Sequence, residues 1–212
     1  MYYDLIIVAR SSTPALIQMT QNCINSAGAD NVILVETGDG FNYSGVDKVV
    51  DYEGQFNYHR ALNMGLEFVK GDVHILANND IVFHEWKTIG EDMIYNGFDS
   101  ASAWFNGSRF MQGEYIFEGY NIAEHLLGWC IFITSEGLKK IGRLSEDVDF
   151  WYSDNIYAEQ LKRARLRHGL FCNVRVDHIG SQTLQTMPIK LKRHYSIDQL
   201  VKYNHAKRDR IH

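Results

Sequence analysis

The most informative stretch of this chain is Asp72-Val-His-Ile-Leu-Ala-Asn-Asn-Asp80-Ile81. Its apolar run has the length of a buried strand, and three polar residues stop that strand before apolar sequence resumes. Asn and Asp favour turns, so a polar turn is one interpretation. The other is that Asp80 is held at the edge of the core, where its carboxylate binds a divalent cation that can bridge a diphosphate.

Short apolar runs alternate with amphipathic segments on both sides of this stretch. Before it, strands are expected at 4–9, 32–36 and 48–52 and helices at about 14–27 and 58–69. After it, strands are expected at 101–105, 115–117, 126–134 and 170–176, and helices at 136–141, 154–168 and beyond Pro188. This order predicts an α/β fold: a Rossmann-type sandwich whose mixed central sheet is flanked by helices, in a single domain with a helical C-terminal tail.

The composition excludes several classes of protein. With 212 residues, of which 45% are hydrophobic and 22% charged, the chain is neither disordered nor collagen-like. No apolar run reaches the roughly 18 residues of a membrane-spanning helix, so no transmembrane segment is expected. Cys23, Cys130 and Cys172 lie far apart, which indicates buried free thiols rather than a zinc or redox site. Free thiols favour a cytoplasmic location.

The formal net charge of −5 hides two regions of opposite sign. Residues 1–159 carry 9 Lys and Arg against 23 Asp and Glu, a charge of −14, and residues 160–212 carry 12 against 3, a charge of +9. Two interpretations of the basic tail, residues 186–212, stay open. It binds an anionic partner, nucleic acid included, or it docks on the acidic body of its own chain.

Ligands of open α/β sheets bind beyond the carboxyl ends of the parallel strands. Polar residues lie at these ends of three predicted strands: Arg10, Glu36 and the triplet Asn78-Asn79-Asp80. The common nucleotide-binding and hydrolase motifs are absent from the sequence. A ligand site is therefore expected at this edge, although none of those motifs identifies the ligand.

Five segments resemble, in order along the chain, glycosyltransferase family 2, the nucleotide-sugar transferases with the GT-A fold. They are Phe56–Gly65, Lys70–Ile81, Gly128–Thr134, Phe150–Arg163 and Val176–Ser181. The second is similar to the stretch that carries the family's D-x-D motif, the fourth to its E-D element and the last to a late H-x-G-S element. The resemblance implies a GT-A-like domain over residues 1–185, with a donor half of about 1–100 and an acceptor half of about 101–185.

The resemblance also implies roles for individual residues. Asp154 would be the catalytic base that deprotonates the acceptor hydroxyl. Asp80 and His178 would hold Mn²⁺ or Mg²⁺. Sugars and bases stack on aromatic faces, so Trp129 and Trp151 are candidate acceptor walls, with core packing as the alternative. The residues around the donor would be Arg10, Glu36, Arg60, Asn63, Asn78 and Asn79.

The implied function is that of a metal-dependent inverting glycosyltransferase. It would move a sugar from a nucleotide sugar, most often a UDP-sugar, to a hydroxyl of a glycan or lipid-linked saccharide. Asn78 and Ser153 replace the acidic residues of the family's D-x-D and E-D elements, so a non-catalytic nucleotide-sugar-binding module is an alternative. A transferase acting on a modified nucleic-acid base is another. The role of base could also pass to the nearby carboxylates Glu146, Asp147 and Asp149.

Overall fold

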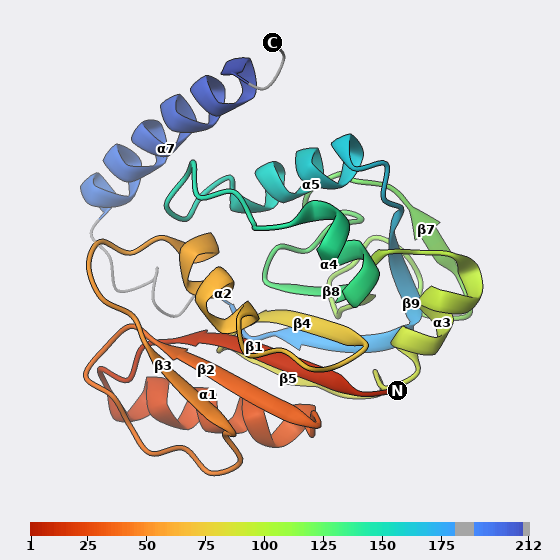
Figure 1. Ribbon diagram of the computed structural model, residues 1–212, viewed down its shortest axis with the longest axis horizontal. Helices are drawn as coiled ribbons and strands as arrows, with labels where there is room; N and C mark the ends of the chain where they lie inside the picture. Colours follow the sequence, from red (N-terminus) through yellow and green to blue (C-terminus); the bar gives the residue numbers. More distant parts are fainter. Residues whose placement is uncertain (181–188, 210–212) are drawn as a thin grey trace.

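The computed structural model describes residues 1–180 and 189–209, and Figure 1 shows a central sheet with helices packed on both faces. The first half of the chain forms β1 (Tyr3–Ala9), α1 (Pro14–Ala27), β2 (Asn31–Glu36), β3 (Lys48–Asp51), α2 (Tyr58–Leu66), β4 (Val73–Asn78), β5 (Ile81–Phe83) and α3 (Ile89–Asn96). The second half forms β6 (Ser100–Trp104), β7 (Ile116–Glu118), β8 (Cys130–Thr134), α4 (Ser135–Ile141), α5 (Ser153–Arg163), β9 (His168–His178) and α7 (Ile189–Asp209).

The strands form one nine-stranded mixed sheet, which confirms the predicted fold class. Its order is β3-β2-β1-β4-β8-β6-β9-β5, with β7 paired to β9. The strands β1 to β4 run parallel to one another, whereas β8 runs antiparallel to both β4 and β6. The parallel first half therefore presents the carboxyl ends of its strands at one edge of the sheet.

Alternate side chains of the parallel strands enter two separate cores. On β1, Leu5 and Ile7 pack into the core that contains Cys23 of α1. Ile6 and Val8 point to the opposite face, into the core that contains Leu62 of α2. A strand that is covered on both faces needs apolar residues at every position, and this accounts for the uninterrupted apolar runs of the sequence.

The first helix begins and ends where the sequence predicts. The hydroxyl of Thr13 accepts a hydrogen bond from the backbone N–H of Leu16, and Pro14 occupies the first turn. Gly28 ends α1 with a φ of 54°, a left-handed conformation that favours glycine. This helix packs against the sheet on the side opposite α2 (Figure 1).

Several element boundaries differ from the expectation. The helix expected at 154–168 ends at Arg163, because Arg165 adopts a φ of 56° and the chain turns there. The strand that follows is longer than expected: β9 runs from His168 to His178 rather than over 170–176. The strand expected at 126–134 is shorter and begins at Cys130. All three cysteines are buried and free in the described part of the chain, as predicted.

The described part of the basic tail lies against the acidic body. Lys202 of α7 donates a hydrogen bond to Asp149 at 2.7 Å, and the ring of Tyr203 stacks on that of Tyr152. Residues 186–188 of the tail and those after Asp209 lie outside the described residues, as does Ser181. Of the two interpretations of the tail, docking on the body thus has direct contacts. None of the described helices is long and apolar enough to cross a membrane.

A buried histidine stands at the start of β9. His168 is fully buried, with its Nδ1 2.9 Å from the hydroxyl of Ser100 and its Nε2 3.1 Å from the carbonyl oxygen of His125. The Ser100 hydroxyl also lies 2.8 Å from that of Tyr157. Burial lowers the pKa of His168 from 6.5 to about 4, so the ring is neutral in the folded protein near neutral pH.

The free energy of unfolding should therefore fall as the pH drops below the pKa of His168 in the unfolded chain. Below pH 6.5 the unfolded chain takes up a proton that folded His168 accepts only near pH 4. We expect this residue to remove about 2 kcal/mol of unfolding free energy between about pH 7.5 and pH 5. Urea unfolding of the wild type and of a His168→Gln variant at several pH values measures this loss of unfolding free energy. An equal pH dependence in both proteins would contradict the prediction.

Candidate functional site

The candidate site lies at the carboxyl ends of β1, β2 and β4. The register pairs Ala9 with Glu36 and Val8 with Asn78, so the three strand ends are level. The second half of the chain reaches the same place, because His178 at the end of β9 pairs with Ile81 of β5. The sheet thereby brings together residues that are far apart in the sequence.

Asp80 and His178 form the centre of the site. Asp80 is 4% exposed, and its Oδ2 lies 3.0 Å from Nε2 of His178. Among the described residues, Oδ1 of Asp80 has no hydrogen-bond partner, and the 3.0 Å contact of His178 Nε2 with Asp80 Oδ2 lacks hydrogen-bond geometry. Buried polar atoms without partners are costly, so a group that contacts both atoms would stabilise them. This geometry favours the ligand interpretation of Asp80 over a plain turn.

The residues present suit a divalent cation that is only partly held by protein. Within the described ranges, no three His, Cys, Asp or Glu side chains are grouped as a metal site. Asp80 and His178 supply two candidate ligand atoms, one oxygen and one nitrogen. Mg²⁺ is commonly held by one or two carboxylates together with substrate phosphates. The unpartnered atoms therefore fit a cation whose coordination a bound phosphate completes.

Trp129 connects this centre to the second half of the chain. Its ring stacks on His178, with centroids 5.1 Å apart and planes 15° apart. Phe105 meets the Trp129 ring edge-on at 5.6 Å, and the backbone N–H of Asn78 donates to the Trp129 carbonyl at 2.9 Å. The orientation of the His178 ring is therefore set by an aromatic neighbour that is itself fixed to the end of β4.

Asp154 lies beside Gly128, the residue before Trp129. A Cβ placed on Gly128 would come within 2.6 Å of the Asp154 Cβ, so the close approach requires glycine. The Oδ1 of Asp154 accepts a hydrogen bond from the backbone N–H of Asn155 at 2.8 Å. Burial raises the pKa of Asp154 above its ordinary value. A half-buried carboxylate with a raised pKa has the properties of a general base.

The three neighbouring carboxylates are engaged elsewhere in the fold. Glu146 pairs with an arginine of α2 at 2.9 Å, and Asp147 accepts a hydrogen bond from a nearby serine hydroxyl. Asp149 accepts a hydrogen bond from Lys202 at 2.7 Å. Asp154 is thus the carboxylate of this group that packs against the glycine beside Trp129, and it keeps the role of candidate base.

Two residues expected around the donor contact the same loop. Arg60 donates through Nε to Glu146 at 2.9 Å. The buried side-chain amide of Asn63 donates to the carbonyl of Leu144 at 2.8 Å and accepts from its N–H at 2.9 Å. These contacts give Arg60 and Asn63 a place in the fold, and their contact with a donor stays a prediction.

Glu36 organises the turn that follows β1. It is 2% exposed and accepts hydrogen bonds from the backbone N–H groups of Ser11 at 2.9 Å and Gly38 at 2.7 Å, as well as from the Ser11 hydroxyl. Arg10 is exposed beside this turn, and a Cβ on Gly38 would lie 3.1 Å from its Cγ. Arg10 is the predicted donor residue that the fold leaves facing solvent at the strand end.

The two asparagines before Asp80 differ in their surroundings. Asn79 donates through Nδ2 to the hydroxyl of Thr20 on α1 at 2.9 Å. Asn78 is half-buried at the end of β4. Asn79 therefore fastens the turn to α1, and Asn78 is the better placed of the two for contact with a ligand.

Tyr58 is a site residue that the sequence did not indicate. It is 5% exposed at the start of α2, and its hydroxyl finds no hydrogen-bond partner in the described part of the chain. Burial raises the pKa of Tyr58, and the charges of Asp80 and Asp154 act in the same direction. The hydroxyl is therefore within electrostatic reach of both carboxylates. A tyrosine at the start of a helix gave no sign of this position in the sequence.

Removing the Tyr58 hydroxyl should stabilise the free protein. An unpartnered buried hydroxyl costs about 1 kcal/mol or more, so Tyr58→Phe is expected to raise the unfolding free energy by about that amount. Tyr157 is the matched control, because its buried hydroxyl lies 2.8 Å from that of Ser100 and Tyr157→Phe should lower stability. Urea unfolding compares the two variants. A destabilised Tyr58→Phe would show that its hydroxyl is already bonded.

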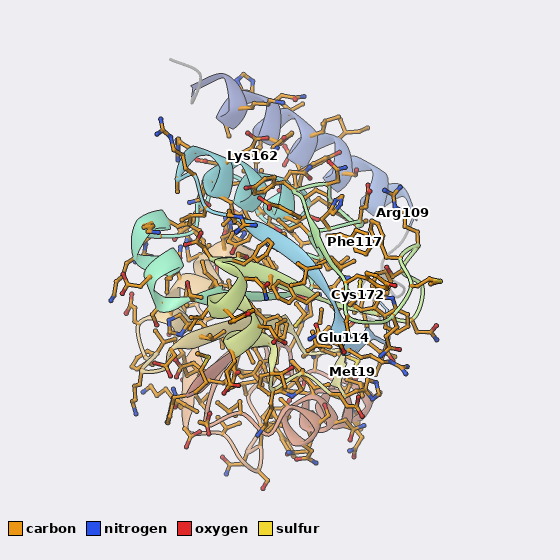
Figure 2. All side chains as sticks on the ribbon, turned by 90° about the vertical axis from the view of Figure 1, so that its right-hand side faces the viewer. Met19, Arg109, Glu114, Phe117, Lys162 and Cys172 are labelled. Carbon is orange, nitrogen blue, oxygen red and sulfur yellow. The ribbon has the colours of Figure 1, made fainter. Side chains whose placement is uncertain are left out.

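Aromatic side chains gather in the second half of the chain. Phe110, Phe117 and Trp129 pack around a small cluster that includes Cys172. Figure 2 shows Phe117 and Cys172 on the same side of the molecule. Trp151 is half-buried in the segment that leads into α5. Trp129 thus borders the centre of the site, whereas Trp151 belongs to the segment before Asp154.

Comparison with known proteins shows which solved structure this fold resembles. No family model and no curated protein matches the sequence. Among solved structures, the crystal structure of GalNAc-T7 with UDP, GalNAc and Mn²⁺ matches with a TM-score of 0.67 at 11% sequence identity. The match covers 88% of this chain and 45% of that chain, so this chain spans less than half of its length. At this identity the likeness concerns the fold, and the chain has the GT-A fold of glycosyltransferases.

Proposed function

We propose that the chain is a glycosyltransferase that uses a nucleotide-sugar donor. The observation that carries this proposal is the pair Asp80 and His178 at the strand ends. Oδ2 of Asp80 lies 3.0 Å from Nε2 of His178, and Oδ1 of Asp80 has no hydrogen-bond partner among the described residues. Asp154 packs against Gly128, the residue before the Trp129 that stacks on His178. A centre that would bind a diphosphate, with a candidate base against the same turn, suits transfer from a diphosphate leaving group.

The proposed donor is a UDP-sugar. The fold is shared with a transferase that was crystallised with UDP, GalNAc and Mn²⁺, and this supports the choice. We assign Asp80 and His178 as the residues that hold Mn²⁺ or Mg²⁺. A divalent cation bound there would supply positive charge to the diphosphate leaving group. The exposed Arg10 and the half-buried Asn78 are assigned to the same donor.

Transfer is proposed to occur by a single displacement. The acceptor hydroxyl oxygen forms a bond to the anomeric carbon as the bond from that carbon to the diphosphate oxygen breaks. The electron pair of the broken bond leaves with the diphosphate, and Asp154 takes the hydroxyl proton. The raised pKa of Asp154 makes it a stronger base than an exposed aspartate. Displacement from the opposite face inverts the anomeric configuration.

The acceptor is proposed to be a saccharide hydroxyl. Trp129 and the aromatic residues packed beside it offer ring faces of the kind on which sugars stack. Trp151, in the segment before Asp154, is assigned to the same acceptor wall. The acceptor half is thus built from side chains that suit a glycan or lipid-linked saccharide.

The proposal is tested by ligand-dependent stability and by product analysis. Melting temperatures are measured with UDP and a panel of UDP-sugars, UDP-GalNAc included, with and without Mn²⁺. Released UDP is then assayed with saccharide acceptors, and the anomeric configuration of the product is determined by NMR. A melting temperature that no nucleotide changes, together with no UDP release, would reject the proposal. Retained configuration would reject the single displacement alone.

A further inference from the structure

The segment Asp149–Tyr152 leads the chain into α5, and one buried side chain of α7 holds its start. Gln199 is fully buried. Its Oε1 accepts hydrogen bonds from the backbone N–H groups of Asp149 at 2.6 Å and Phe150 at 3.4 Å. Its Nε2 donates to Oδ2 of Asp149 at 2.9 Å. Gln199 thus binds both the backbone and the carboxylate of the segment.

Two neighbouring residues of α7 extend this contact. Lys202 donates through Nζ to Oδ2 of Asp149 at 2.7 Å, and this hydrogen bond raises the pKa of Lys202. The ring of Tyr203 stacks on the ring of Tyr152, with centroids 5.3 Å apart and planes 10° apart. The basic tail therefore holds the first and the last residue of the segment.

The backbone of Tyr152 explains why the segment needs such support. Tyr152 precedes the first turn of α5 with a φ of 68°, in the left-handed region that residues other than glycine rarely adopt. Its side chain makes no capping hydrogen bond within the described residues. Such a conformation persists only where the surroundings hold it. Asp154 follows two positions later, so the turn at Tyr152 sets where its carboxylate lies.

The opposite side of the segment contacts the start of α2. The backbone N–H of Tyr58 donates to the Asp149 carbonyl at 2.6 Å, and the rings of Tyr58 and Phe150 meet edge-on with centroids 5.9 Å apart. Figure 1 shows α7 on the outside of the molecule, across this segment from α2. The segment is therefore held between two helices, and only α7 belongs to the tail.

We propose that α7 is a positioning element of the transfer reaction, in which Gln199 and Tyr203 fix the Asp149–Tyr152 segment and thereby hold Asp154 against Gly128. The inference rests on the proposed function, because it requires Asp154 to act as base. Gln199 and Tyr203 are assigned no contact with substrate. They act by keeping a catalytic carboxylate in the geometry for proton transfer, where a displacement of about 1 Å is costly.

The test compares variants on the two faces of α7 in the full chain. Gln199→Ala and Tyr203→Ala remove the contacts, Tyr203→Phe keeps the stacked ring, and Leu200→Ala changes an outward-facing residue that is 40% exposed. Amide hydrogen exchange is followed by mass spectrometry over residues 147–157. Turnover of a UDP-sugar with Mn²⁺ gives kcat and the KM for the donor.

Both alanine variants of the contact face should speed amide exchange over 147–157. They should lower kcat about 10- to 100-fold and change the donor KM by less than about twofold. Tyr203→Phe and Leu200→Ala should match the wild type in all measurements. Faster exchange with unchanged kcat would overturn the proposal and leave α7 as a structural contact. Unchanged exchange in both alanine variants would overturn it too.

The failure of the proposed function has a different signature. A wild type that turns over no UDP-sugar would remove the reaction that α7 is proposed to serve, whatever the exchange data show. A loss of kcat in the contact-face variants that comes with a melting temperature lowered to the assay temperature would count as unfolding. In that case the same variants are assayed at a lower temperature, where a wild-type kcat would overturn the proposal.

Discussion

Replacing Asp154 with Asn is expected to lower UDP-sugar turnover by about 100- to 10,000-fold, the usual contribution of a general base. The variant keeps the size of the side chain and an oxygen that can accept the 2.8 Å hydrogen bond from the N–H of Asn155. It loses the negative charge and the basicity with which the carboxylate would take the acceptor proton. The fold and the melting-temperature shift with UDP and Mn²⁺ should be those of the wild type, because Asp154 is assigned no contact with the diphosphate.

The matched control is Glu159→Gln on the same helix. Glu159 pairs with Lys162 at 3.5 Å near the surface, so its loss should leave kcat within about twofold of the wild type. Steady-state kinetics of released UDP measure both variants. Wild-type turnover in Asp154→Asn would show that another group takes the proton, and Asp147 would be the next variant to make.

Replacing Asp80 with Asn is expected to abolish the Mn²⁺-dependent part of UDP binding. Asn keeps an oxygen at the position but not its charge, and it adds an amide next to Nε2 of His178, which lies 3.0 Å from Asp80 Oδ2 in the wild type. The melting temperature with UDP should then be equal with and without Mn²⁺, and turnover should fall by about 100-fold or more. The free protein should keep its fold, because the Oδ1 of Asp80 has no partner to lose among the described residues.

Asp177→Asn is the control for this second variant. Asp177 precedes His178 on β9, but its carboxylate contacts His84 at 3.0 Å and accepts from the Asn106 N–H at 3.0 Å. The Asp177→Asn variant should therefore retain the Mn²⁺-dependent shift of the melting temperature with UDP. If Asp80→Asn binds UDP with the same Mn²⁺ dependence as the wild type, Asp80 is not a ligand and the donor site must lie elsewhere.

The parallel half of the fold could be predicted because each signal is local. The apolar runs of β1, β2 and β4 mark strands that are buried on both faces, and Thr13, Pro14 and Gly28 mark the ends of α1. The missed elements depend on distant partners. β5 has three residues, and its pairing with β9 forms only once the chain has folded. The end of α5 was misplaced because Arg165, a residue with no turn preference, adopts the positive φ.

The candidate site divides in the same way. Asp80 could be found from the sequence, since a carboxylate after a buried strand lies at the ligand-binding edge of an α/β sheet. The contact of His178 with Asp80 depends on the register of β5 and β9. Tyr58 carried no sequence signal, because an aromatic residue at a helix start is ordinary in a core.

The sequence by itself determined the class of fold and the separation of charge along the chain, and it predicted the edge of the sheet at which a ligand is expected. Hydrophobic pattern and strand order are properties of neighbouring residues, so they can be read before folding. Only the tertiary structure showed that three of four nearby carboxylates have partners elsewhere in the fold, and where the described part of the basic tail docks. Glu146 and Asp149 are engaged by residues from α2 and α7, which lie far from them in the sequence. Those contacts are long-range pairings, and the same charges could have been matched in many other ways.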